Sequence, residues 1–216
     1  MTTPTSLYKK LLKHFGRQYW WPAETPFEVM VGAILTQQTN WGNALKAIEN
    51  LKREKLLSPQ KIQKTPNSKL HKVIRSSGYF KQKAKKLKIF CNFFLEEFGG
   101  SIKKIKAESL NALRPRLLEL WGIGRETADS ILLYALDKPV FVVDAYTIRV
   151  GERIPMFKSE GYEHVRSFFE SKIPKSIYLY KEYHALLVEL GKNYCRKKPN
   201  CKSCPIRKSC KYSAKL

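Results

Sequence analysis

Apolar residues recur every three or four positions along most of the chain, and this spacing is typical of amphipathic helices. One such run follows Thr25, Pro26 and Glu28, which form a capping box with proline at the first helical position. Another starts near Lys83 and ends at the paired glycines 99 and 100, which are typical of a helix C-terminus. We expect further helices over residues 125–136 and 178–192.

One short apolar run interrupts this helical pattern. Residues 140–143 read Val-Phe-Val-Val and resemble a strand, but the run is too isolated to build a sheet. We therefore expect a buried extended link here and an all-α fold. A chain of 216 residues is long enough for one large domain or two small ones with buried cores.

The composition indicates a soluble protein with a polyanionic partner. Lys and Arg total 41 against 18 Asp and Glu, so the net charge is +23, while 43% hydrophobic residues argue against disorder. Nucleic acid is the commonest partner of so basic a chain, and a generic basic surface is the alternative. No segment reaches the roughly 18–20 apolar residues that a membrane span needs, and the start lacks a secretion signal. We expect a cytoplasmic protein that binds no membrane.

Four of the five cysteines lie close together near the end of the chain. Cys195, Cys201, Cys204 and Cys210 have the close spacing of thiolate ligands, which suits a [4Fe–4S] cluster or a zinc ion. Cys91 stands alone within an apolar helical pattern, and we expect it in the core.

A glycine turn between two helices is a candidate phosphate site. Gly122, Ile123 and Gly124 separate the helices, and the second helix would begin with free amide groups that can hold an anion. An ordinary helical hairpin is the alternative. Trp121 stands at the apolar position of the hairpin, and we expect it to be structural. Farther along, Asp144 follows the buried run at the start of a helix, where an N-cap is its simplest role.

Together, residues 117–150 resemble the helix–hairpin–helix and Gly/Pro-Asp signature of the DNA base-excision glycosylases. The resemblance extends to residues 26–28, 35–39 and 78–84. It implies a double-stranded DNA partner with a damaged base, and Asp144 acting at the sugar of the flipped-out nucleotide. The implied phosphate contacts are Lys83, Gly122, Ile123, Gly124 and Arg125.

The same resemblance implies two helical domains that flank a DNA-binding groove in a monomer. Residues 25–135 would form the central domain, ending in the helix–hairpin–helix over about 117–136. Residues 1–24 and 136–216 would form the second domain, which carries the cysteine loop 195–210. The endonuclease III branch ends in a similar loop, which favours a [4Fe–4S] cluster, although this chain has five rather than six residues in the first gap. Arg196, Lys197 and Lys198 in that loop are placed for phosphate contact, and a solvated basic face is the alternative.

The branch of the superfamily can be narrowed by residues that are missing. Bifunctional members carry a Schiff-base lysine two residues after the second hairpin glycine, where this chain has Glu126. The adenine-mismatch branch carries a catalytic Glu where this chain has Ala33. The first departure favours hydrolysis without strand cleavage, and the second disfavours the adenine-mismatch branch.

The aromatic residues are similar to those of the 3-methyladenine DNA glycosylase III (MagIII) type. Trp20 and Trp41 stand at the positions that sandwich the extruded base in that type, and Trp21 is a further candidate for the base pocket. Indole rings attract cations, so a positively charged alkylpurine suits such a pocket. Core packing is the alternative for all three tryptophans.

Two glutamines and a histidine complete the candidate residues. Gln38 matches the residue that endonuclease III inserts into the duplex gap, and Gln37 is the alternative because the MagIII type has glutamine there. His184 lies on a late amphipathic helix, and we expect a packed or surface residue rather than a catalyst.

These features predict a monofunctional DNA glycosylase that flips out and excises alkylated purines such as 3-methyladenine. The alternatives are a uracil or thymine mismatch glycosylase, an endonuclease III-like enzyme with abasic-site lyase activity, and a DNA-binding protein without activity.

Overall fold

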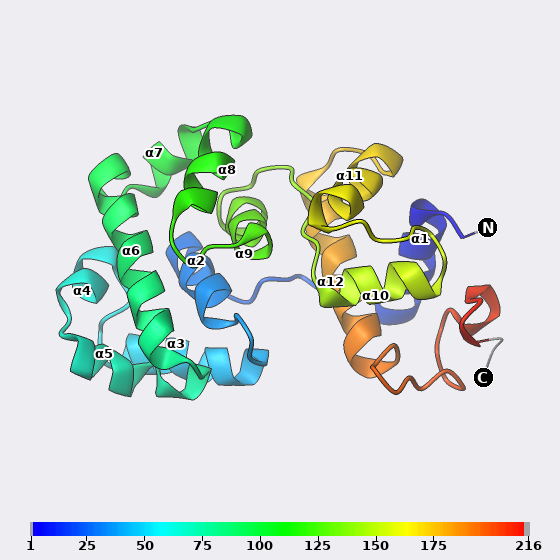
Figure 1. Cartoon of the computed structure of the whole chain (residues 1–216), viewed down its shortest axis with the longest axis horizontal. Helices are drawn as coiled ribbons and strands as arrows, with labels where there is room; N and C mark the ends of the chain where they lie inside the picture. Colours follow the sequence, from blue (N-terminus) through cyan, green and yellow to red (C-terminus); the bar gives the residue numbers. More distant parts are fainter. Residues whose placement is uncertain (1, 214–216) are drawn as a thin grey trace. The chain divides into compact units, whose positions relative to one another are not determined.

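The computed structural model describes residues 2–213, and the ordered elements in that range are all helical, which confirms the all-α prediction (Figure 1). The longer helices are α1 (Pro4–Phe15), α2 (Pro26–Leu35), α3 (Trp41–Arg53), α6 (Phe80–Phe98), α8 (Leu110–Glu119), α10 (Ala145–Arg153), α11 (Tyr162–Lys172) and α12 (Ile177–Asn193). The shorter ones are α4 (Pro59–Lys64), α5 (Asn67–Val73), η1 (Arg75–Ser77), α7 (Ile102–Ala107), α9 (Arg125–Ser130), the π-helical segment η2 (Ile131–Ala135) and η3 (Arg207–Ser209). Every helix in the described part of the chain is too short or too polar to cross a membrane.

The chain folds as two compact units. Unit 1 contains the residues up to Pro22 together with those from Pro139 onward, and unit 2 contains residues 23–138. The sequence predicted these divisions after residues 24 and 135, each within three residues of those in the structure.

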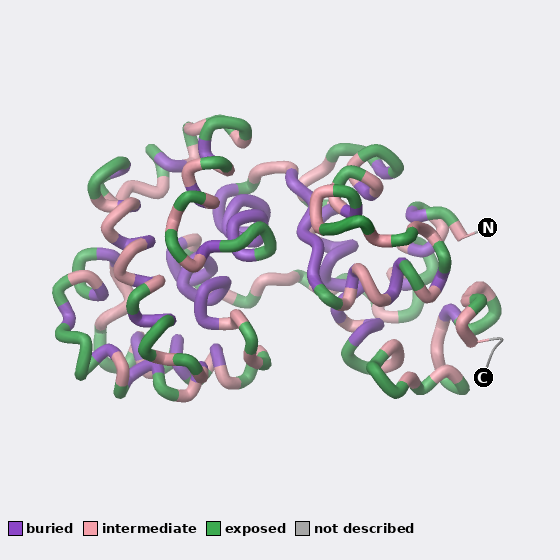
Figure 2. The backbone as a smooth tube through the Cα atoms, viewed as in Figure 1, coloured by how far each residue is buried: buried purple, intermediate pink, exposed green. Residues whose placement is uncertain are grey.

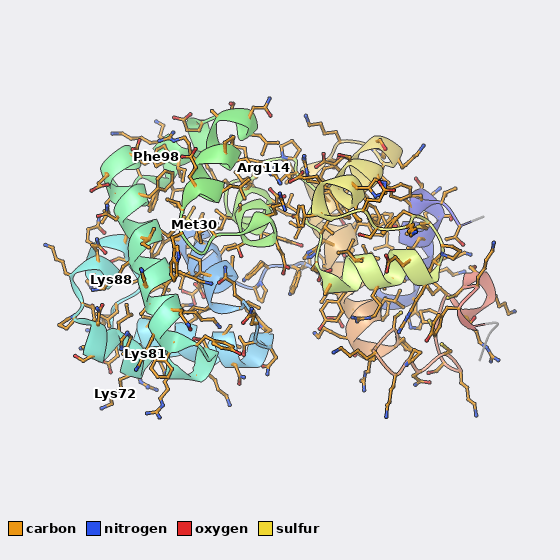
Figure 3. The ribbon with its side chains drawn as sticks, viewed as in Figure 1. Met30, Lys72, Lys81, Lys88, Phe98 and Arg114 are labelled. Carbon is orange, nitrogen blue, oxygen red and sulfur yellow. The ribbon has the colours of Figure 1, made fainter. Side chains whose placement is uncertain are left out.

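In unit 2, α2 is the central helix and packs against α3, α6, α9 and η2. Nine of its ten residues are buried, and Figure 2 shows the corresponding run of buried chain. Met30 of α2 lies in the interior, whereas Lys72 and Lys81 are exposed at the periphery of the unit (Figure 3). The sequence predicted one apolar face for this helix, whereas in the structure almost its whole circumference is buried.

Local sequence signals set the ends of these helices. The Thr25 hydroxyl accepts a hydrogen bond from the Glu28 amide at 3.1 Å, as the capping box predicts. The Glu28 carboxylate departs from that motif, because it accepts from the Glu24 amide and pairs with Lys52 Nζ at 2.8 Å. Helix α6 ends at Gly99, whose φ of 61° lies in the left-handed region that glycine adopts easily.

Unit 1 is built on α12, against which α1 and α10 pack. The Tyr183 hydroxyl donates a hydrogen bond to the Pro4 carbonyl at 2.9 Å and so joins the first helix to the last long one. Residues 140–143 are buried and belong to no regular element, which confirms the predicted link. Asp144 follows this link directly and lies at the start of α10.

Candidate active site

Asp144 lies at the N-cap of α10 with 8% of its surface exposed. Its Oδ1 accepts a hydrogen bond from the Thr147 amide at 2.7 Å, which satisfies one of the free amides at the helix start. The other carboxylate oxygen, Oδ2, lies 3.7 Å from Nε2 of His184. The N-cap role is therefore present, and half of the carboxylate faces a second partner.

The charge state of Asp144 follows from opposing effects on its pKa. Burial raises the pKa, but the His184 side chain and the Thr147 hydrogen bond together lower it further than burial raises it. The net result is a pKa below the usual value, so the carboxylate is ionised at neutral pH. Asp144 thus provides a buried negative charge.

His184 is buried, with 4% exposure, and comes from the middle of α12. Its ring lies 5.6 Å from that of Trp20 between centroids, at an interplanar angle of 36°. Trp20 in turn stacks on Trp21 at 5.5 Å and 26°, and both indoles are partly exposed. Unit 1 therefore brings together a carboxylate, an imidazole and two indoles. The sequence pattern predicted a packed or surface histidine and did not place it beside Asp144.

The helical hairpin of unit 2 is formed by α8, a glycine turn and α9. Arg114 of α8 donates two hydrogen bonds to the fully buried Asp129 of α9, from Nε at 2.7 Å and from Nη2 at 3.0 Å. Such a bidentate ion pair fixes the two helices relative to each other. This ion pair therefore stabilises the packing of α8 against α9.

The turn residues of the hairpin differ in what they can offer a phosphate. Gly122 has a φ of 83°, and a Cβ there would lie 2.6–2.8 Å from side-chain carbons of Lys86. Gly124 is exposed, and a Cβ there would meet none of the described atoms within 4 Å. Ile123 departs from its predicted role, because its amide donates to the Leu120 carbonyl at 3.0 Å and its side chain is buried. Arg125 and Glu126 are exposed at the start of α9.

Gln37 connects the end of α2 to this hairpin. Its Nε2 donates to the Gly122 carbonyl at 3.0 Å and to the Thr127 hydroxyl at 2.8 Å, while its Oε1 accepts from Lys86 Nζ at 2.6 Å. Gln38 is exposed and has a φ of 51°. The structure therefore engages Gln37 inside unit 2 and leaves Gln38 at its surface.

Lys83 does not occupy the exposed position that a phosphate contact requires. Its side chain is 2% exposed, and Nζ donates to the carbonyls of Leu35 at 2.8 Å and Ser77 at 2.6 Å. Burial, with a smaller contribution from the nearby charge of Lys86, lowers the pKa of Lys83 to about 8. The prediction of a phosphate contact for Lys83 is thus corrected. Its buried amine instead links the end of α2 to the end of η1.

Two further tryptophans belong to unit 2. Trp41 begins α3 and is partly exposed. Trp121 was expected to be structural, but it is 49% exposed, with Lys85 Nζ 4.4 Å from its ring centroid. Trp121 is thus a surface residue of the hairpin turn, held in a cation–π contact.

The four C-terminal cysteines line one pocket of unit 1. Arg153, the last residue of α10, donates to Cys195 Sγ at 3.3 Å and to the Arg196 carbonyl at 2.6 Å. Cys210 Sγ lies 3.6 Å from the Arg153 carbonyl. The loop is therefore fastened to the end of the helix that begins at Asp144.

The arrangement of these thiols can be compared with what a single metal ion needs. A tetrahedral zinc ion with bonds of about 2.3 Å needs sulfurs roughly 3.8 Å apart. Residues 2–213 contain no group of three or more histidine, cysteine or acidic side chains gathered tightly enough for one ion. Four cysteines around a shared space are a donor set that suits either a zinc ion or a [4Fe–4S] cluster.

The other residues of the cysteine loop and the fifth cysteine are also placed. Arg196, Lys197 and Lys198 are all exposed. Cys91 is fully buried, which confirms its core position, and burial raises the pKa of its thiol to about 12.

Comparison with known proteins matches residues 31–175 to the HhH-GPD superfamily of base excision DNA repair proteins. A candidate DNA repair glycosylase of Methanocaldococcus jannaschii is 48% identical over 206 residues, which cover 94% of each chain. Endonuclease III of Thermotoga maritima is 28% identical over 208 residues, covering 95% of this chain and 91% of the relative.

Solved structures are similar over most of the chain. H. pylori 3-methyladenine DNA glycosylase (MagIII) bound to 1,N6-ethenoadenine has a TM-score of 0.77 and 32% identity, covering 88% of this chain and 98% of that one. An endonuclease III–DNA covalent intermediate has a TM-score of 0.84 and covers 100% of this chain and 99% of that one. At 24% identity, this match shows a similar fold only.

Proposed function

The chain belongs to the HhH-GPD superfamily of base excision DNA repair proteins, and we propose that within it the protein is a monofunctional DNA glycosylase for alkylated purines. The observation that carries the proposal is the buried, ionised carboxylate of Asp144 in the same unit as the Trp20 indole. The Asp144 carboxylate would act on the sugar, and the Trp20 indole would bind the base.

In the proposed reaction, the bond between C1′ of the sugar and the purine nitrogen breaks, and its electron pair leaves with the base. The sugar then carries a positive charge, which the Asp144 carboxylate stabilises across a short distance in a poorly solvated site. Water adds to C1′ and gives up a proton to the solvent, leaving an abasic site in an intact strand. An alkylated purine is already positively charged and leaves as a neutral base, so no general acid is required.

The absence of a lyase step is supported by the residue two positions after Gly124. Glu126 stands there, exposed at the start of α9, and a carboxylate cannot form a Schiff base with C1′. We therefore expect the abasic product to dissociate without strand cleavage.

The choice of base is supported by the tryptophans. An indole face attracts a cation by about 0.5–2 kcal/mol, which favours a methylated purine over its neutral parent. Trp20, beside His184, would supply one face of the base pocket, with Trp21 behind it. Trp41, the first residue of α3 in unit 2, is the other tryptophan that the family resemblance assigns to the base.

The contacts to undamaged DNA would come from exposed groups. Gln38 is the better candidate to fill the gap left by the flipped nucleotide, because Gln37 is occupied by the hairpin. Gly124 and Arg125 at the hairpin, with Arg196, Lys197 and Lys198 of the cysteine loop, would bind phosphate.

We also propose that Cys195, Cys201, Cys204 and Cys210 hold a [4Fe–4S] cluster. The cluster would cross-link the loop and keep its basic residues in place, a structural contribution that a folded metal site makes. Purified protein should then be yellow-brown, with broad absorption near roughly 400 nm and four irons per chain. Colourless, folded protein with one zinc per chain would contradict this assignment.

A panel of lesion-bearing duplexes tests the enzymatic proposal. We expect release of free 3-methyladenine from methylated duplex, strand breakage only after hot alkali, and no covalent adduct after borohydride treatment. Trp20→Ala and Trp41→Ala should each cost about 1–3 kcal/mol in excision of the cationic base and less for a neutral base. Cleavage without alkali would refute the monofunctional reaction, and preferred release of uracil or thymine would refute the purine substrate.

A further inference from the structure

His184 lies beside both halves of the candidate site. Its Nε2 is 3.7 Å from Oδ2 of Asp144, and its ring centroid is 5.6 Å from that of Trp20. The three residues come from separate parts of unit 1: the middle of α12, the start of α10 and the segment after α1. The folded unit therefore places the imidazole in contact range of the group proposed for the sugar and the ring proposed for the base.

The two oxygens of Asp144 are held unequally. Oδ1 has a short hydrogen bond to the Thr147 amide, at 2.7 Å. A single such bond leaves the carboxylate able to turn about its terminal torsion, which is broad for aspartate. The 3.7 Å separation on the Oδ2 side is within ion-pair range but beyond a normal hydrogen bond. His184 is thus the neighbour of the oxygen that Thr147 does not hold.

We propose that His184 is a positioning residue that orients the Asp144 carboxylate through Oδ2 and sets its place relative to the Trp20 ring. The inference rests on the proposed function, because the orientation matters only if Asp144 acts at the sugar. His184 itself touches neither the sugar nor the leaving base in this scheme.

The orientation should affect the reaction rate more than DNA binding. An electrostatic stabiliser acts on charge that develops in the transition state, so a small misplacement weakens it without loss of ground-state contacts. A displacement of about 1 Å in a catalytic group can cost about 100-fold in rate. His184 is 4% exposed and is therefore too buried to contribute a phosphate contact of its own.

Two substitutions separate orientation from packing. His184→Gln retains an amide N–H donor at about the reach of Nε2, whereas His184→Leu fills similar space without a donor. In single-turnover excision of 3-methyladenine from methylated duplex, we expect His184→Leu to lower the rate by about 10–100-fold. We expect His184→Gln to remain within about 5-fold of wild type, and both to bind the duplex within about 3-fold of wild type, because neither removes a DNA contact.

A purely packing role predicts the opposite order, since leucine retains the apolar contact with Trp20 better than glutamine does. A rate for His184→Leu equal to or above that of His184→Gln would therefore overturn the inference. Tyr183→Phe is the matched control, because Tyr183 lies next to His184 on α12. The substitution removes the hydrogen bond from Tyr183 to the Pro4 carbonyl of α1, and we expect a lower Tm with an unchanged excision rate.

Two further outcomes keep the test decisive. If His184→Leu does not fold, His184→Asn replaces it, because its shorter amide mimics Nδ1 and cannot reach Oδ2; equal rates for the glutamine and asparagine variants would overturn the inference. If wild-type protein excises no base from any duplex, the proposed function fails. If wild type is active and His184→Leu is equally active, only the positioning role fails.

Discussion

At the scale of single residues, the Asp144 carboxylate combines an observed structural task with the chemical task proposed for it. Oδ1 caps α10 through the Thr147 amide, while Oδ2 faces His184. An amide in place of the carboxylate can still accept the capping hydrogen bond, so the two tasks can be separated by one substitution.

We therefore expect Asp144→Asn to abolish base excision while DNA affinity stays within a few-fold of wild type. The neutral amide provides no charge to stabilise a cationic sugar. Glycosylase assays and binding titrations on the same duplex measure the two properties. Turnover retained by the variant would exclude Asp144 from the mechanism.

Lys83 provides a prediction for stability as a function of pH. Its pKa in the folded protein is about 8, below the ordinary 10.5, so the folded state releases its proton first as the pH rises from 8 towards 10.5. The unfolded state then binds more protons, and the unfolding free energy contributed by this group increases with pH. Neutral lysine still has two N–H donors for the Leu35 and Ser77 carbonyls.

Urea unfolding of wild type and Lys83→Met at pH 7.5 and pH 10 tests this sign. We expect wild type to be the more stable at both values, with the difference larger by about 2 kcal/mol at pH 10. A difference that shrinks as the pH rises would mean that the buried amine is charged throughout.

At the scale of elements, the two glycines of the α8–α9 hairpin have different tasks. Gly122→Ala combines a φ of 83° with a contact below 3 Å to Lys86, which Gln37 holds in place. We expect it to lower the unfolding free energy by about 2 kcal/mol. Gly124→Ala meets none of the described atoms and should leave stability within about 0.5 kcal/mol.

The methyl group of Gly124→Ala would instead occupy the space through which a phosphate approaches the hairpin. We expect roughly tenfold weaker binding to undamaged duplex, comparable to the loss of one charge-assisted hydrogen bond. Thermal unfolding and DNA titration of both variants check this contrast. Equal affinities for wild type and Gly124→Ala would show that phosphate does not approach there.

Elements with local signals were predictable from the sequence, and contacts between distant elements were not. The Thr25 cap and the Gly99 stop act within a few residues of themselves, so their spacing identifies α2 and α6. Lys83 looked like a surface lysine because its two carbonyl partners lie in other segments. The contact between His184 and Asp144 was hidden for the same reason, since it depends on how α10 packs against α12.

At the scale of the whole molecule, the net charge of +23 should make DNA binding strongly dependent on salt. A chain that neutralises several phosphates releases their counterions, so the logarithm of the affinity falls linearly with the logarithm of salt concentration. Arg196, Lys197 and Lys198 are exposed on the cysteine loop.

We expect alanine at each of these three positions to reduce the salt slope by about 1. The control is Lys72→Ala, which removes one exposed charge from α5, outside the predicted phosphate contacts, and should leave the slope unchanged. Affinities measured across a salt series give the slopes. A triple alanine variant with the wild-type slope would show that the loop does not touch phosphate.

The assembly of unit 1 from both ends of the chain also dictates an order of events during synthesis on the ribosome. Helix α1 emerges first, with Leu7 and Leu11 that are buried in the folded unit, but α12, against which α1 packs, comes last among the long helices. At about 5–20 residues per second, these leucines wait roughly 10–35 s for their partner. Unit 2 is contiguous and can finish folding in that interval. The nascent protein thus acquires its hairpin before the carboxylate of Asp144 is in place.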